Sequence, residues 1–225
     1  MKPSVLAIVP ARAHSKRIPG KNKKIFMGKP LIDWSIDAAL SSGCVTDVYV
    51  TTDDEDILQF KTHYPSVHFV NRPAELAVDS TPGVEPVLHL MNQIGRVYDY
   101  VLLLQPTSPL RDSEHIDAAF KTLLENKAPQ IVSVKKMSDT LGHIVYKTND
   151  GLQFLKNNIS EKSEENQLKV LNGAIYISEW KTLLTEKTFL GKGVSFFEMD
   201  ELSSVDIDFP DDWQRAERYA SMKVQ

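Results

Sequence analysis

One stretch of the sequence, residues 10–24, combines small residues with cations in a way that suits a polyanion. Ala11 and Ser15 let backbone N–H groups approach a phosphate, and Arg12, Lys16 and Lys21 can add charge-assisted hydrogen bonds. The glycine spacing of a Walker loop is absent, and so is the dinucleotide fingerprint. We interpret this stretch as an anion-binding loop, with a solvated surface loop as the alternative.

A second stretch places two carboxylates on one face of an extended chain. Asp206 and Asp208 are two residues apart and alternate with apolar residues, so both point to the same side. Two converging carboxylates repel each other unless a cation lies between them, and Mg²⁺ prefers oxygen ligands shared with phosphates. The pair is a candidate metal site, with a solvated edge strand as the alternative. Asp211 and Asp212 are better explained by the dipole of the helix that follows.

The elements that must position these groups alternate along the chain. Hydrophobic periodicity predicts strands at 4–9, 46–51, 67–70, 100–104, 131–134, 172–177 and 204–208. It predicts helices at 31–40, 53–62, 86–94, 113–125 (with Ser113 as N-cap) and 210–222. Such alternation predicts an α/β fold with a mainly parallel sheet covered on both faces, and ligands bind such sheets beyond the carboxyl ends of the strands.

Composition restricts the class of protein. The 225 residues are 42% hydrophobic and 25% charged, which is typical of one globular α/β domain, here residues 1–225. The lone Cys44 and the lack of a long apolar run favour a cytoplasmic protein without a membrane partner. The net charge is −4, yet residues 1–32 contain eight cations and no acid. Such a local cluster fits a triphosphate better than a nucleic acid, which needs a wider basic surface.

Six segments, in order, resemble the motifs of the CMP-sialic acid synthetase (acylneuraminate cytidylyltransferase) family. They are 10–22 (PARAHSKRIPGKN), 51–53 (TTD), 72–76 (RPAEL), 104–111 (LQPTSPLR), 172–176 (NGAIY) and 204–208 (SVDID). The resemblance covers nearly the whole chain. It implies a three-layer fold of the nucleotide-diphosphosugar transferase type and transfer of CMP from CTP to an acidic nine-carbon sugar.

The resemblance also implies roles for individual residues. The catalytic residues would be Arg12, Lys21, Asp206 and Asp208. The residues that bind CTP would be Ala11, Arg12, Ser15, Lys16, Lys21, Asn22, Arg72 and Ser80. Those that bind the sugar would be Gln105, Thr107, Ser108, Lys169 and Asn172. Asp206 and Asp208 would hold Mg²⁺, with Mn²⁺ as an alternative. The base that deprotonates the sugar is left open between a metal-bound hydroxide and one of the aspartates. Arg111 is left open between pairing with a substrate carboxylate and capping its loop.

One departure from the family concerns the acceptor. Relatives that activate sialate place arginines just before the NGAIY segment, whereas this chain has Val170 and Leu171 there and no Arg between Arg111 and Arg215. The sugar is therefore expected to be legionaminate, pseudaminate or another nonulosonate rather than N-acetylneuraminate. The alternatives are a Kdo-type cytidylyltransferase and a non-catalytic nucleotide-binding module of the same fold.

The polar stretch 143–167 interrupts the alternation of strands and helices. It is too long for an ordinary connection in a compact domain. We predict that 136–170 forms a dimerisation arm of a homodimer, with a disordered linker as the alternative. In such a dimer Lys156 or Lys162 of a second copy could reach the sugar.

Overall fold

The computed structural model describes residues 2–78, 80–137, 145–148, 151–154 and 169–223. Its main feature is a seven-stranded sheet in the order β11-β7-β10-β6-β1-β4-β5. Its strands are β1 (Val5–Ala11), β4 (Asp47–Thr52), β5 (Val67–Asn71), β6 (Tyr100–Leu103), β7 (Gln130–Lys136), β10 (Lys169–Glu179) and β11 (Ser195–Glu198). The helices are α1 (Leu31–Ser41), α2 (Glu55–Leu58), α3 (Glu85–Gln93), α4 (Ser113–Glu125), α5 (Trp180–Glu186) and α6 (Pro210–Lys223).

Short elements complete the described chain. Three are 3₁₀ turns: η1 (Lys21–Lys23), η2 (Gln59–Thr62) and η3 (Ala74–Leu76). Two strand pairs are separate from the large sheet: β2 (Ile25–Phe26) with β3 (Lys29–Pro30), and β8 (Val145–Thr148) with β9 (Gly151–Phe154). Residues 138–144, 149–150 and 155–168 of the predicted dimerisation arm, including Lys156 and Lys162, lie outside the described residues.

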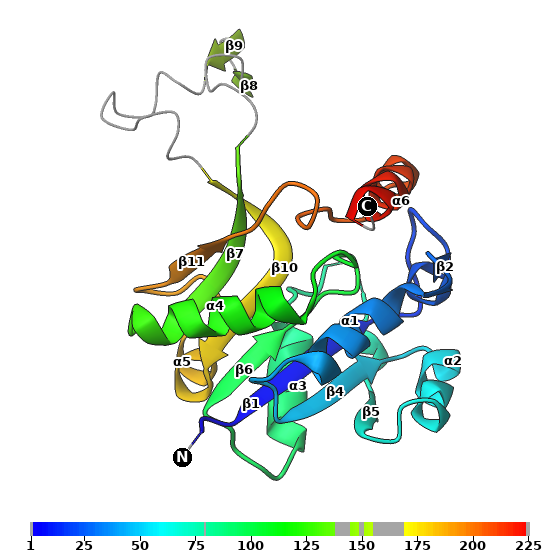
Figure 1. Cartoon of the computed structure of the whole chain (residues 1–225), viewed down its shortest axis with the longest axis vertical. Coiled ribbons are helices and arrows are strands. Elements are labelled where there is room, and N and C mark those ends of the chain that lie inside the picture. Colours follow the sequence, from blue (N-terminus) through cyan, green and yellow to red (C-terminus); the bar gives the residue numbers. More distant parts are fainter. Residues whose placement is uncertain (1, 79, 138–144, 149–150, 155–168, 224–225) are drawn as a thin grey trace.

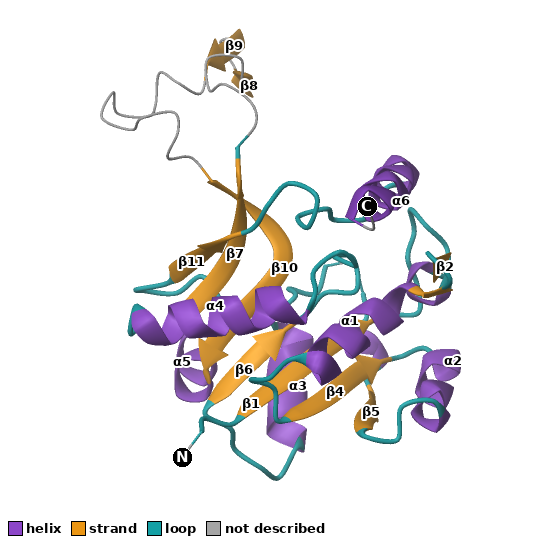
Figure 2. Ribbon diagram, viewed as in Figure 1, coloured by secondary structure: helices purple, strands orange, loops and turns teal. Residues whose placement is uncertain are grey.

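The sheet is mainly parallel, as predicted. β1 pairs in parallel with β4 and β6, β4 with β5, and β7 with β11. β10 is antiparallel to both of its neighbours, β6 and β7 (Figure 2). The carboxyl ends of β1, β4, β5 and β6 therefore lie at one edge of the sheet, where a ligand site is expected.

The three predicted layers follow from the alternation of side chains along the strands. On β1, Val5, Ala7 and Val9 pack with α1 and α4, and Leu6 and Ile8 pack with α3 and α5 on the other face (Figure 1). All five side chains are fully buried. Burial of a Val, Leu or Ile side chain contributes about 1.5–3 kcal/mol to stability. The hydrophobic effect therefore favours burial of both faces of this strand.

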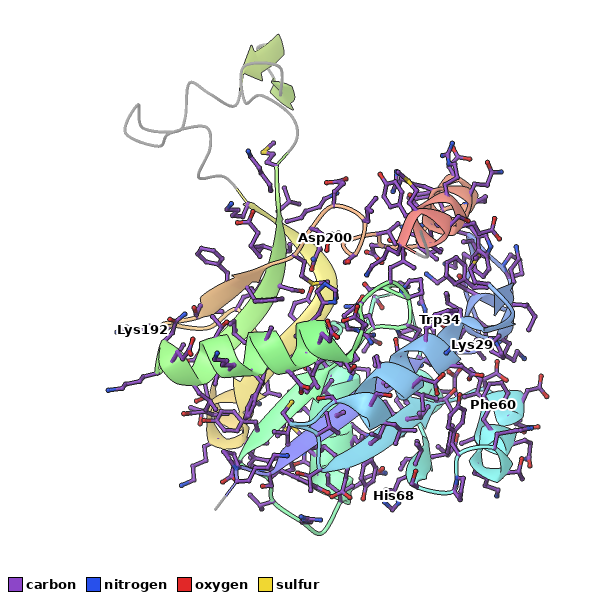
Figure 3. All side chains as sticks on the ribbon, in the orientation of Figure 1. Lys29, Trp34, Phe60, His68, Lys192 and Asp200 are labelled. Carbon is purple, nitrogen blue, oxygen red and sulfur yellow. The ribbon has the colours of Figure 1, made fainter. Side chains whose placement is uncertain are left out.

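A third apolar cluster attaches α6 to the rest of the molecule. Val205 and Ile207 are buried against Trp213 and Ala216 of α6. The preceding turn is held by Asp200 (Figure 3), whose side chain accepts a hydrogen bond from Ser203 N at 2.9 Å. The C-terminal helix thus supports the segment that carries the two predicted metal ligands.

Two sequence predictions are wrong in detail. Residues 204–208 are not a strand, because their apolar side chains pack on α6 and their backbone contacts a loop, with Ile207 N donating to Thr107 O at 2.8 Å. The apolar Val205 and Ile207 are nevertheless buried, whereas Asp206 and Asp208 are half-buried. The N-cap of α4 is Asp112 rather than Ser113, since the Asp112 carboxylate accepts from His115 N at 3.1 Å.

Across the helices that the structure describes, none combines the length and the apolar character needed to cross a bilayer.

Candidate functional site

A cavity of about 290 Å³ lies beyond the carboxyl ends of β1 and β6. The residues that line it include eight of the predicted site residues: Arg12, Ser15, Lys21, Asn22, Arg72, Gln105, Thr107 and Asp208. Leu76, Val78, Thr81, Gly83 and Pro86 form its outer wall. Segments from both halves of the chain therefore meet at one polar cavity.

The cation-rich loop is held in one conformation by its own contacts. Gly20 has φ +63°, a left-handed conformation that glycine adopts readily, and it starts the η1 turn. The buried Asn22 donates from Nδ2 to Arg12 O at 3.1 Å. Ala13 N donates to Asp53 Oδ1 at 2.9 Å. These contacts order the loop before any ligand arrives.

Asp53 also orients Arg72. Arg72 Nη2 lies 3.1 Å from Asp53 Oδ1, and the Arg72 side chain is only 4% exposed. Burial lowers the pKa of Arg72, and the bond to Asp53 opposes this effect. Sequence reasoning gave no role to Asp53, although an acid directly after a central strand was a usable signal. The same carboxylate thus holds the loop and one wall of the cavity.

Lys21 connects the loop to the acidic segment. Its Nζ donates to Ile207 O at 2.8 Å and lies 3.3 Å from Asp208 Oδ1. Arg17 Nη1 lies 3.0 Å from Asp208 Oδ2. Two segments separated by more than 180 residues are therefore joined by ion pairs at the edge of the cavity.

Asp206 is more deeply buried in the protein than Asp208, whose side chain is 49% exposed. Burial raises the pKa of the Asp206 carboxyl group, a hydrogen bond with Thr107 opposes this, and the nearby Asp208 raises it further. Its Oδ1 atom is buried and has no hydrogen-bond partner among the described residues. At Gly173, where φ is +76°, a Cβ atom would lie 3.5 Å from Asp206 Oδ2 and 3.7 Å from Gln105 Oε1. The bend of β10 at Gly173 thus lets its backbone approach both side chains.

The acidic pair fits a cation that phosphates would share. Asp206 Oδ1 is an unpaired buried oxygen, and the two carboxylates raise each other's energy when both are ionised. Within the described part of the chain, no group of three or more His, Cys, Asp or Glu residues could hold a metal by itself. Two carboxylates without a third suit Mg²⁺, which takes its other ligands from water and substrate phosphates.

Several predicted site residues occupy other positions. The side chain of Ala11 is fully buried in the core. Lys16 and Ser80 are exposed and do not line the cavity. Ser108 is fully buried, and Lys169 pairs with Glu198 at the start of β10. None of these five residues lines the 290 Å³ cavity, and their predicted roles remain predictions.

Asn172 is held by hydrogen bonds within the protein and does not line the 290 Å³ cavity. It is 4% exposed, accepts from Ser133 Oγ at 2.5 Å and donates to Ser204 Oγ at 2.9 Å. It therefore ties the irregular part of β10 to β7 and to the acidic segment.

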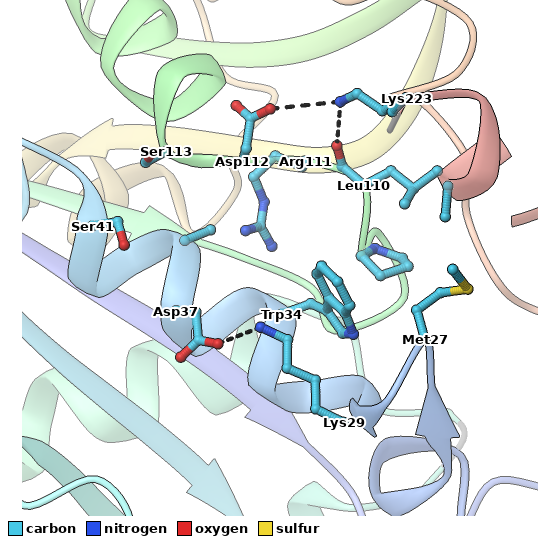
Figure 4. A pocket seen from close by; sticks show the side chains of 13 residues that line it. Met27, Lys29, Trp34, Asp37, Ser41, Leu110, Arg111, Asp112, Ser113 and Lys223 are labelled. Atoms are coloured by element: carbon cyan, nitrogen blue, oxygen red, sulfur yellow. Dashed lines mark hydrogen bonds and ion pairs between the residues drawn. The ribbon is translucent and has the colours of Figure 1, made fainter. Parts of the chain in front are cut away.

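Arg111 lies behind the site and does not line the 290 Å³ cavity. It is 1% exposed, donates from Nη2 to Ser35 Oγ at 2.7 Å, and Ser35 Oγ in turn donates to Gln105 O at 3.2 Å. Burial lowers its pKa to about 10. Figure 4 shows it beside Trp34 and Lys223 in a separate cavity of about 500 Å³. Of the two roles left open for Arg111, the structure favours support of the loop.

Known proteins share both the fold and the sequence pattern of this chain. Two solved structures share the fold with TM-scores of 0.73: a CMP:2-keto-3-deoxy-manno-octonic acid synthetase complexed with CTP (18% identity, 98% of this chain and 99% of that one) and a 4-diphosphocytidyl-2C-methyl-D-erythritol synthase from Anaerococcus prevotii (14%, 98% and 97%). The family model for cytidylyltransferases matches residues 6–224. The chain belongs to the cytidylyltransferase family.

Curated relatives refine this membership. The chain is 34% identical to a CMP-N,N'-diacetyllegionaminic acid synthase of Legionella pneumophila, over 98% of both chains. It is 35% identical to an N-acylneuraminate cytidylyltransferase of Escherichia coli, with 96% of this chain covering 52% of that one. It is 29% identical to a pseudaminic acid cytidylyltransferase of Campylobacter jejuni, over 90% of both. The resemblance seen in the motifs is therefore confirmed.

Proposed function

We propose that this enzyme transfers CMP from CTP to the anomeric hydroxyl of a nonulosonic acid and releases pyrophosphate. The observation that carries the proposal is the meeting of the cation-rich loop and the acidic segment at one cavity, through Lys21 and Asp208 at 3.3 Å. The names of the relatives support both the nucleotide and the class of acceptor.

The cation-rich loop binds the triphosphate in this proposal. Arg12, Ser15 and Lys21 line the cavity where the phosphates would lie, and Arg72 lines it as well. The sugar oxygen forms a bond to the α-phosphorus while the bond from that phosphorus to the bridging oxygen breaks. Arg12 and Lys21 stabilise the charge that develops on the leaving pyrophosphate, as preorganised donors do in such transfers.

Asp206 and Asp208 hold Mg²⁺ in this proposal, with Mn²⁺ as an alternative. The bound ion supplies charge neutralisation for the phosphates. Gln105 and Thr107 border the same cavity beside Asp206, where they orient the hydroxyl groups of the acceptor. Orientation of this kind contributes much of the acceleration of phosphoryl and nucleotidyl transfer.

Two further expectations belong to this proposal. The lone buried Cys44, whose pKa burial raises to about 11, is consistent with a structural thiol in a cytoplasmic enzyme. A homodimer joined through residues 136–170 would place the arm of one chain near the site of the other.

The direct test is a substrate panel. Purified protein is incubated with Mg²⁺, one nucleoside triphosphate and one acid sugar, and pyrophosphate release is measured. The panel contains CTP, UTP and ATP, each with legionaminate, pseudaminate, N-acetylneuraminate and Kdo. The proposal expects turnover with CTP and a nine-carbon acid. Turnover with Kdo alone, or with no acceptor of the panel, would contradict it.

A further inference from the structure

A second cavity opens on the other side of Asp206. It has a volume of about 120 Å³ and is lined by Lys135, Leu171, Asn172, Glu201, Ser204, Val205, Asp206, Arg215 and Tyr219. The volume suits a carboxylate with the carbon next to it rather than a whole nine-carbon sugar. Leu171, which stands where relatives have arginines, forms one wall of this cavity.

Asp206 places this cavity next to the reaction site. The Asp206 carboxyl group is hydrogen-bonded with Thr107, which lines the nucleotide cavity. Gly173 brings the β10 backbone close to both Asp206 and Gln105. In a nonulosonic acid the carboxylate is bonded to the anomeric carbon, so it must lie within a few bonds of the attacking oxygen. The carboxylate therefore belongs in a space that adjoins Asp206.

Arg215 is held so that it can serve this space. Its Nη2 lies 2.6 Å from Asp212 Oδ1, and its side chain is 47% exposed. The other oxygen of Asp212 accepts from Asp208 N at 3.0 Å and Phe209 N at 2.8 Å. One carboxylate thus fixes both the guanidinium and the backbone of the acidic segment. A guanidinium has five N–H donors in a planar fork, so the pairing with Asp212 leaves donors for a second carboxylate.

Lys135 reaches the cavity from the sheet. It lies on β7, and its Nζ is 3.4 Å from Glu201 Oε1. The two cations of the lining face two acids, Glu201 and Asp206. Lys135 is paired with Glu201 and Arg215 with Asp212, and each cation keeps further N–H donors for the carboxylate of an acid sugar.

We propose that Arg215, assisted by Lys135, binds the carboxylate of the acceptor sugar and replaces the arginines that this chain lacks before Asn172. The inference rests on the proposed function and specifies its acceptor site. The proposal places recognition of the sugar carboxylate on α6 and β7. In the relatives described above, that role belongs to arginines just before the NGAIY segment.

The test compares two pairs of neighbouring cations. Arg215→Ala is matched by Arg218→Ala, since Arg218 is exposed on the same helix and does not line the cavity. Lys135→Ala is matched by Lys136→Ala, an exposed neighbour on β7. Arg215→Lys keeps the charge but loses the planar fork. KM for the sugar, KM for CTP and the Tm are measured for each variant, and the sugar that the wild type accepts is used.

Arg215→Ala is expected to raise the sugar KM by about 10- to 100-fold, the range of a lost charged hydrogen bond, with the KM for CTP changed by less than about 3-fold. Lys135→Ala is expected to have a smaller effect in the same direction, and Arg215→Lys an intermediate one. Calorimetric binding of the sugar to the protein with a non-hydrolysable CTP analogue should show the same order without turnover.

The carboxamide of the same sugar separates a carboxylate contact from a loss of structure. The wild type should bind it weakly, and Arg215→Ala should bind it no worse than the wild type does. Equal sugar KM values for Arg215→Ala and Arg218→Ala would overturn the inference, and so would equal losses with the acid and the amide. Absence of CTP-dependent turnover in the wild type would instead refute the proposed function, and this inference with it.

Discussion

Lys21 contacts both parts of the candidate site through a single ammonium group. Its side chain is 12% exposed, and its partners are the Ile207 carbonyl and the Asp208 carboxylate. Its position on a short 3₁₀ turn leaves little core to disturb when it is changed. This makes it the most informative residue at which to separate chemistry from folding.

We expect Lys21→Ala to lower the turnover by about 10²–10³-fold, because a preorganised donor to developing charge is lost. Lys23→Ala is the matched control, since Lys23 pairs with Asp54 and Asp56 and does not line the nucleotide cavity. It should keep nearly full activity. Steady-state pyrophosphate release, with circular dichroism to confirm folding, gives the comparison. Equal activity of the two variants would mean that the loop does not bind the phosphates.

The buried hydrogen bonds that run from Arg111 through Ser35 to the Gln105 carbonyl lead to a second prediction. Ser35→Ala removes the hydroxyl group between Arg111 and the Gln105 carbonyl, so a buried guanidinium loses a partner. We expect a loss of about 1–3 kcal/mol in the free energy of unfolding and a higher KM for the sugar with little change for CTP. Ser41→Ala, at the exposed end of the same helix, should change stability by less than about 0.5 kcal/mol. Denaturant unfolding and substrate titrations measure both effects, and an unchanged sugar KM in Ser35→Ala would show that these hydrogen bonds do not position Gln105.

At the scale of elements, the parallel strands and most helices could be predicted, because burial on both faces leaves continuous apolar runs and the long helices have clear periodicity. What could not be predicted depends on contacts distant in sequence. The antiparallel direction of β10 follows from its pairing with β6 and β7, and the shape of 204–208 follows from α6. The buried hydrogen bonds of the Asn172 amide could not be predicted either, since a sequence motif does not show which way a side chain points.

Helix α1 carries an acid that should make stability depend on pH. Burial, with the nearby Asp37, raises the pKa of Asp33 to about 6, whereas an unfolded Asp titrates near 3.9. The folded state therefore holds this proton more tightly, and its contribution to stability is present below about pH 4 and lost as the pH rises through about 6.

Asp33→Asn removes that dependence. At pH 8 the variant should be more stable than the wild type by about 1 kcal/mol, after allowance for solvent screening, and the difference should vanish near pH 4. The exposed Glu125→Gln on α4 is the control and should show no such trend. Thermal unfolding from pH 4 to pH 8 measures the differences. A pH-independent difference for Asp33→Asn would contradict the assignment.

At the scale of the whole molecule, one end of the sheet carries apolar side chains that face solvent. Val170, Leu171 and Phe196 are 40%, 44% and 55% exposed; Val170 and Leu171 lie at the start of β10, directly after the predicted arm, and Phe196 lies on β11. Exposed apolar residues gathered at one place commonly mark an association surface. They support the proposed homodimer through residues 136–170.

Light scattering over a dilution series should give the mass of a dimer, twice the 25.4 kDa of one chain. Val170→Asp should shift the protein toward monomer, because a charge would be buried in the contact. Leu190→Asp, at a residue 52% exposed in the loop before β11, should leave the mass unchanged. A monomeric wild type at every concentration would contradict the dimer.

The packing of α6 has a consequence for how the enzyme folds during its synthesis. The two aspartates are held by a helix that ends at Lys223, and the same helix supplies Arg215. During synthesis, the cation-rich loop and the strands β1, β4, β5 and β6 leave the ribosome well before this helix does. Ile18 and Phe26, in and beside that loop, pack in one cluster with Val205 and Trp213, so the loop completes its packing only when α6 docks. A chain whose translation stops before α6 would lack the contacts that hold Asp206, Asp208 and the loop together.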